Sequence, residues 1–178
     1  MTWSITRYSC VLAVMVLLFS SSAPAADLTS RYTTITYFSD DDLRAFNREL
    51  YMGRLQSRLP KNRGNTVADE VIVKIDYIVE KVMSVLDMYP ADLRFSIVIH
   101  PDTAGVKQEF KRLYHMDVNY IAFYSPTQNQ VFFSANNARL RVVAHEIGHV
   151  VAENYFTISP PQKIHEVMAQ FAEQHITD

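Results

Sequence analysis

The chain has 178 residues, of which 48% are hydrophobic and 20% are charged. This length suits one domain, and the composition is that of a globular protein, which excludes a disordered, collagenous or coiled-coil chain. The 17 basic and 19 acidic side chains give a formal net charge of −2. We therefore expect no nucleic-acid partner, because the chain has neither a basic excess nor a block of Lys and Arg. The only cysteine, Cys10, lies in a segment that we expect to be removed, which excludes a thiol nucleophile, a cysteine zinc site and a disulfide framework.

Residues 1–25 have the pattern of a secretory signal peptide. Arg7 precedes an apolar run at 10–19, and the small residues that follow end at Ala25 in an A-x-A cleavage site. An uncleaved anchor is the less favoured alternative, because so short a run cannot cross about 30 Å of hydrocarbon at about 1.5 Å per residue. We therefore predict an exported protein, periplasmic or secreted. Its mature part, residues 26–178, is expected to be a single domain that does not remain inserted in a membrane.

The N-terminal part of the mature chain, residues 26–116, is predicted to begin with a strand and a long helix. β-branched and aromatic residues fill positions 31–38, a composition typical of a strand. Three aspartates at 40–42 then begin a helix that we expect to reach about Leu59, where Pro60 ends it. Three consecutive side chains spread around a helix, so this acidic run is a solvated helix start rather than a metal site.

A second long helix completes the predicted N-terminal pair. Thr66 and Asp69 have the spacing of a capping box. Apolar residues then recur every three or four positions from Val71 to Leu86, which predicts a helix that packs on the core. The segment 93–99 is a candidate buried strand, and 103–115 is predicted to form a shorter helix.

The C-terminal part, residues 117–178, is predicted to contain a β-hairpin and two helices, which makes the whole an α+β domain. A turn rich in polar residues separates the two hairpin strands, and two prolines precede the last helix, where a missing N–H costs least. The elements are a hairpin of 120–124 and 131–134, a helix over about 138–153 capped by Asn136 or Asn137, and a final helix opened by Pro160 and Pro161.

The segment His145-Glu-Ile-Gly-His149 has the spacing of a metal site. Residues four apart differ by about 40° around a helix, so both imidazoles leave one face and can reach a single tetrahedral zinc ion. Glu146 is rotated by about 100° from His145. It would lie beside the metal, where a carboxylate can accept a proton from the attacking water. This H-E-x-x-H arrangement is typical of metallopeptidases, and a coincidental histidine pair on a solvated helix is the less favoured alternative.

A tetrahedral catalytic zinc needs a third protein ligand, which must be His, Asp or Glu in a mature chain without cysteine. Glu166 is our choice, because the loop at 154–159 allows the final helix to fold back against the H-E-x-x-H helix. His165 is the main rival, since a small rotation of the helix would select it. The weaker rivals are Glu153, Glu173 and His175.

These motifs resemble the gluzincin metallopeptidases, in particular their compact single-domain members. The resemblance covers roughly residues 117–175 and rests on the H-E-x-x-H helix, on Glu166-Val-Met-Ala169 and on the hairpin. It implies a zincin-like fold: a small mixed sheet in which 131–134 is an edge strand over the H-E-x-x-H helix and binds an extended peptide by backbone pairing. It also implies one Zn²⁺ per chain, bound by His145, His149 and Glu166, with Glu146 as the general base.

Two features depart from the gluzincin pattern. Many gluzincins have an aspartate four residues after the ligand glutamate, where it orients a zinc-bound histidine, whereas this chain has Gln170. The sequence also contains no long C-terminal domain to form the second wall of a cleft. Residues 26–116 resemble no family, and supplying that wall or covering the site are two roles open to them.

The expected function is that of an exported zinc metallopeptidase acting on a peptide or protein substrate. Tyr155 and His165 are the candidate donors to the developing oxyanion, because both lie near the metal ligands in sequence, with Tyr120 and Tyr124 as further options. The alternatives are a zinc-binding scaffold protein of the cell envelope and a latent enzyme. A structural zinc site does not need Glu146, and its retention favours an active enzyme. The sequence predicts no particular oligomeric state.

Overall fold

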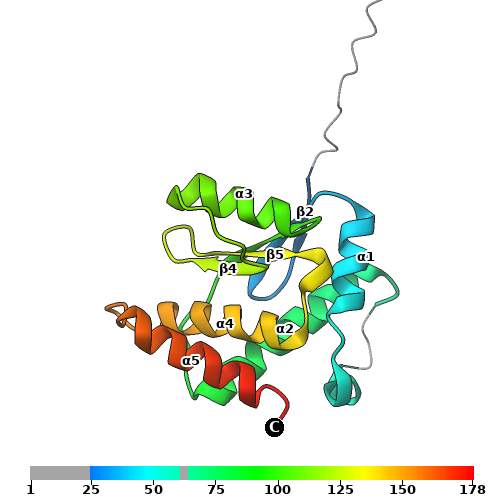
Figure 1. The fold of residues 1–178 in the computed structure, drawn as a ribbon. Coiled ribbons are helices and arrows are strands. Elements are labelled where there is room, and N and C mark those ends of the chain that lie inside the picture. Colours follow the sequence, from blue (N-terminus) through cyan, green and yellow to red (C-terminus); the bar gives the residue numbers. More distant parts are fainter. Residues whose placement is uncertain (1–24, 61–63) are drawn as a thin grey trace, which may run out of the picture.

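The structure is a computed structural model that describes residues 25–60 and 64–178 (Figure 1). The predicted signal peptide, up to residue 24, lies outside the described residues. Strand β1 begins at Ala26, the residue that would follow the predicted cleavage site. Within the described residues, no helix combines the length and the apolar character needed to cross a membrane.

A mixed sheet of five strands forms the centre of the fold, which confirms the predicted α+β class. The three middle strands are parallel, and each outer strand is antiparallel to its neighbour. The strands follow one another across the sheet as β1 (Ala26–Thr29), β2 (Thr33–Tyr37), β3 (Phe95–His100), β5 (Gln130–Ser134) and β4 (Ala122–Ser125).

The predicted hairpin is present, but its free edge is formed by β4 and not by β5. Strand β5, which contains 131–134, pairs with β4 on one side and with β3 on the other. The edge strand is therefore β4, and the prediction that 131–134 is an edge strand was wrong. The burial of β5 from Val131 to Ser134 is typical of a parallel strand inside a sheet, which is covered on both faces.

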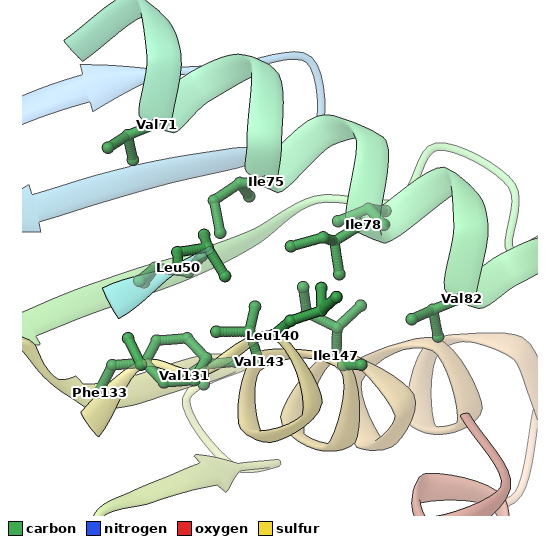
Figure 2. Close-up of a cluster of buried hydrophobic side chains, with 14 of the residues drawn as sticks. Leu50, Val71, Ile75, Ile78, Val82, Val131, Phe133, Leu140, Val143 and Ile147 are labelled. Atoms are coloured by element: carbon green, nitrogen blue, oxygen red, sulfur yellow. The ribbon is translucent and has the colours of Figure 1, made fainter. Parts of the chain in front are cut away.

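Helices cover both faces of the sheet (Figure 1). On one face, α3 places Val106 against Phe123 and Phe132. On the other face, α1, α2 and α4 enclose the main core, and Figure 2 shows side chains of α2, such as Ile78, pointing toward those of α4 and β5. The helices are α1 (Asp40–Glu49), the 3-10 helix η1 (Gly53–Arg58), α2 (Val67–Leu86), α3 (Thr103–Tyr114), the 3-10 helix η2 (Ala135–Asn137), α4 (Leu140–Tyr155) and α5 (Gln162–His175).

Of the predicted pair of long helices, only α2 is long. Its capping box is present, with Thr66 and Asp69 exchanging hydrogen bonds between side chain and backbone. Helix α1 ends at Glu49 instead of near Leu59, and Gly53 adopts a φ of +54° where the chain turns into η1. The apolar residues that suggested one continuous helix are nevertheless buried, and these are Leu50, Met52, Leu55 and Leu59.

Helix α4 begins slightly later than predicted and is not capped by an asparagine. Its N-cap residue is Arg139. The side-chain amides of Asn136 and Asn137 donate instead to the Pro101 carbonyl and to the Ser134 hydroxyl. Both asparagines therefore fix the turn between β5 and α4 rather than the first turn of the helix.

Helices α4 and α5 lie side by side and make the most extensive contact between two elements of the described chain (Figure 1). A β-carbon at Gly148 of α4 would lie 2.9 Å from the Cα atom of Ala169 and 3.3 Å from the Cβ atom of Ala172, both in α5. This approach leaves no room for a side chain at position 148. It explains why α4 contains a glycine, which by itself weakens a helix by about 1 kcal/mol relative to alanine.

We predict that Gly148→Ala destabilises the protein although alanine is the better helix former. Overpacking costs about 1–3 kcal/mol, and the atom that blocks the new methyl group belongs to the backbone of Ala169. Urea unfolding followed by circular dichroism should give a lower midpoint. Ser84→Ala, at an exposed position of α2, is the matched control and should change stability by at most about 0.5 kcal/mol. A stabilised Gly148→Ala protein would contradict the close contact of α4 and α5.

Candidate active site

His145 and His149 leave α4 on the side that faces α5. Their ring centroids lie 5.0 Å apart. Near the start of α5, the Glu166 carboxylate faces both rings, with Oε2 3.7 Å from Nε2 of His145 and Oε1 3.6 Å from Nε2 of His149. The structure thus brings together the three residues chosen from the sequence as metal ligands, and they form a group that could hold a metal ion.

The spacing of these three ligand atoms suits a tetrahedral metal ion. Atoms that lie about 2.05 Å from a tetrahedral zinc ion are about 3.3 Å from one another. The two N–O distances of 3.6 and 3.7 Å, which end on different oxygens of Glu166, are close to this value, and one ligand atom from each of the three residues lies within 4.8 Å of the other two. Two imidazoles and one carboxylate are also a donor set that zinc accepts, with the fourth position left for water or substrate.

His149 is in a state that favours metal binding. Burial lowers the pKa of His149, and the neighbouring His145 lowers it further. An imidazole must be neutral to coordinate a metal ion, so a protonated histidine would first have to lose its proton. The surroundings of His149 therefore prepare it as a ligand near neutral pH.

The other ring nitrogen of His145 contacts Glu173, which was one of the weaker candidates for the third metal ligand. The Nδ1 atom of His145 lies 3.1 Å from Oε2 of Glu173. Position 173 differs from Glu166 by about 20° around α5, so both carboxylates point toward α4, two turns apart. Glu173 is thus no third ligand but occupies the place that an orienting carboxylate takes beside a metal-bound histidine. Gln170, where many gluzincins have an aspartate, is exposed.

The Glu146 side chain is buried beside the two histidines. The pKa of Glu146 is raised to about 8, chiefly by burial and further by the nearby Glu166 and Glu173 carboxylates, while a hydrogen bond from the backbone N–H of Tyr124 opposes these effects. The carboxyl group therefore lies at the edge strand β4 and close enough to Glu166 and Glu173 of α5 to be affected by their charges. A divalent cation at the ligand group would favour the charged form and lower this pKa.

His165 lies next to the ligand group but belongs to another set of hydrogen bonds. Its ring is buried, with its centroid 5.9 Å from that of His149. Its Nε2 atom lies 3.0 Å from Oε2 of Glu153 and 3.2 Å from Oγ of Ser159, which also donates to Glu153. Neither His165 nor Glu153 belongs to the ligand group. These two alternatives to Glu166 as the third ligand interact with each other instead.

Tyr155 is not brought to the site. It is 47% exposed at the end of α4 and packs against Phe156. Its selection rested only on closeness in sequence, and the turn of α4 carries its side chain away from the histidines. Tyr124 lies at the site, but its hydroxyl donates to Asn129, and burial raises its pKa. Among the remaining candidates, His175 pairs with Asp178 instead.

A cavity of about 1090 Å³ contains the ligand group. Glu146, His165 and Tyr120 also line it, whereas Tyr155 is not among its lining residues. Phe110 and Tyr114 of α3 line the opposite wall. The N-terminal part of the mature chain therefore supplies one wall of the cavity, which is one of the two roles left open by the sequence.

In comparisons with known proteins, no protein-family model, no curated protein and no solved structure matches this chain.

Glu146 should destabilise the metal-free protein as the pH rises. Its pKa is about 8 in the folded chain, against an ordinary value of 4.5. Between these values the folded chain holds a proton that the unfolded chain has lost, so stability falls with increasing pH. Glu146→Gln cannot ionise, and its advantage in Tm over the wild type should therefore grow from pH 5 to pH 8 by about 7–14 °C.

Differential scanning calorimetry of both proteins in a chelator measures this difference. Adding zinc should shrink the difference at pH 8, because the cation favours the charged carboxylate. A difference that is constant from pH 5 to pH 8 in the chelator would show that Glu146 is not buried as described.

Proposed function

We propose that the protein is an exported zinc metallopeptidase of the zincin type, similar to the compact gluzincins. One observation carries this proposal: the Glu166 carboxylate from α5 faces the Nε2 atoms of His145 and His149 from α4, with Glu146 buried beside them. A metal site that serves only stability has no use for a buried carboxyl group next to the ligands. Burying such a group is costly unless function requires it.

His145, His149 and Glu166 would hold one Zn²⁺ ion. Zinc in such a site lowers the pKa of water and polarises a carbonyl group. Glu146 would accept the proton of the attacking water at its carboxylate and return it to the leaving amine. Glu173 would fix the ring of His145 through Nδ1, so that Nε2 stays directed at the metal.

The free edge of β4 would hold the peptide in extended form. The N–H of Ser134 donates to the carbonyl of Ile121, so in this antiparallel pair the polar backbone groups of 121, 123 and 125 point to β5. The groups of Ala122 and Tyr124 point outward, and the N–H of Tyr124 reaches Glu146. A substrate strand added at this edge would therefore lie directly beside the proposed general base.

His165 is the remaining proposed donor to the oxyanion, since its ring lies next to His149 in the cavity. The Glu153 carboxylate lies 3.0 Å from Nε2 and fixes the orientation of the ring, so Nδ1 is the ring atom that would donate to an oxyanion. Tyr155 is withdrawn from this role, because its side chain does not line the cavity.

Metal binding tests the ligand assignment. The purified mature protein should hold about one zinc per chain by mass spectrometry, and His149→Ala should lose it. Glu166→Ala should lower zinc affinity more than about 100-fold. Glu173→Gln should lower it by about 10–100-fold, the range of orienting partners. A competition titration with a chromogenic chelator measures these affinities.

The matched controls for the zinc titration are His165→Ala and Gln170→Ala, which should change affinity less than about tenfold because neither residue belongs to the ligand group. A larger loss with His165→Ala than with Glu166→Ala would give the third position to His165.

Hydrolysis tests the function itself. The mature protein should cleave unfolded casein, lose this activity in a chelator and regain it with zinc. Glu146→Gln should keep the metal and reduce kcat by about 10²–10⁴-fold, the usual contribution of a general base. Activity retained in Glu146→Gln would remove Glu146 from this role. A zinc-loaded wild-type protein without hydrolysis would favour the zinc-binding scaffold or the latent enzyme.

A further inference from the structure

The cavity has an aromatic wall on the side away from the proposed metal ligands. Phe110 of α3 is at its centre, with ring centroids 4.7 Å from Tyr114, 5.0 Å from Phe123 and 5.0 Å from Tyr120. All four residues line the cavity. The ring of Tyr120 is fixed edge-on against Phe110, an arrangement in which aromatic rings attract one another. The wall is therefore preformed.

Part of this wall is uncovered apolar surface. Tyr120 is 47% exposed and Ile121 is 39% exposed, and the two residues lead directly into the edge strand β4. An apolar surface that faces a cavity with open backbone groups beside it is typical of a binding site for an apolar side chain on an extended chain.

Apart from the proposed zinc ion and the histidines, the described residues that line the cavity supply no positive charge. Its titratable lining residues are four glutamates and three histidines, besides tyrosines, and no Lys or Arg is found among the described residues that line it. A terminal carboxylate or an acidic side chain of a substrate would meet no cation of the protein there, and like charges repel in a site with little water. The glutamates are Glu146, Glu153, Glu166 and Glu173.

We infer that the cavity takes an interior segment of an unfolded polypeptide, with a large apolar or aromatic side chain against Tyr120 and Phe110 and no acidic residue beside it. This inference rests on the proposed function, which it deepens by naming the substrate class. The cavity of about 1090 Å³ is at the upper limit of sites for a single small ligand. Together with the open strand edge, this size suits several residues of a chain.

A peptide series tests the inference. The peptides are quenched-fluorescence octapeptides blocked at both ends, identical except for one central residue, which is Phe, Ala or Asp. For the zinc-loaded mature protein, kcat/KM should be at least about tenfold higher for Phe than for Ala, and the Asp peptide should be the poorest. Equal rates for the three peptides would overturn the inference.

Tyr120→Ala tests whether the aromatic wall binds the central side chain of the peptide. It should reduce the preference for Phe over Ala, measured as the ratio of the two kcat/KM values, by about five- to tenfold. The control is Tyr89→Ala, at another exposed tyrosine that does not line the cavity, and it should keep the full preference. An unchanged preference in Tyr120→Ala would contradict the placement of the substrate side chain.

Asn119→Arg tests the charge of the cavity, because Asn119 is an exposed lining residue. The added cation should improve cleavage of the Asp peptide relative to the Ala peptide by several-fold, and an unchanged ratio would contradict the role of charge.

Binding separates this inference from the proposed function. Fluorescence anisotropy with zinc-loaded Glu146→Gln measures peptide affinity without cleavage. Selective binding of the Phe peptide by a protein whose wild type cleaves nothing would support the inference and reject the peptidase. Cleavage without selectivity among the peptides would support the peptidase and reject the inference.

Discussion

The close contact of α4 and α5 at Gly148 is the constraint on which the candidate site depends. The backbone of α5 approaches α4 so closely at Ala169 that no β-carbon fits between them. Only at such a short interhelical distance can a glutamate three residues before Ala169 place both of its oxygens within 3.7 Å of imidazoles on the other helix. A glutamate side chain is short, and a wider separation would leave His145 and His149 as a pair without a third ligand. The weakness that a glycine brings to α4 is thus offset by the geometry that it permits.

The electrostatics of the cavity would favour a bound cation. Four glutamates line the cavity and no Lys or Arg of the described chain does, so any negative charge there is balanced within the protein only by histidines. Burial and the charge of Glu166 together raise the pKa of Glu146 well above its ordinary value, which means that the metal-free protein keeps this group neutral at a cost in stability. A divalent ion bound between His145, His149 and Glu166 would reduce the repulsion between Glu146 and Glu166. The other carboxyl groups of the cavity would remain acidic, which is the basis of the substrate class inferred above.

Features fixed by local sequence could be predicted, and features fixed by the packing of distant elements could not. The H-E-x-x-H spacing places two histidines on one helical face whatever surrounds it, and the fold-back that selects Glu166 requires only a short loop and two prolines. Glu173 was underrated because its role depends on the path of α5 along α4, although its seven-residue spacing from Glu166 was a usable signal. The edge strand was misassigned because hairpin residues do not reveal which strand will pair with β3. The selection of Tyr155 as a donor to the oxyanion was based on its closeness in sequence to a ligand. That closeness does not predict where a side chain at the end of a helix points.

The N-terminal part of the mature chain explains how so small a domain forms a cavity with two walls. The lower wall consists of α4 and α5, which carry every proposed ligand. The upper wall is formed by α3, on the opposite face of the sheet from α4, and by the segment between α3 and β4. Because β4 is at the edge of the sheet, side chains from both faces of the sheet can line the same cavity beside it. An interior strand would separate the side chains of the two faces. The position of β4 at the edge therefore has two consequences: backbone groups of Ala122 point outward from the sheet, and the aromatic wall joins the wall that carries the candidate ligand group.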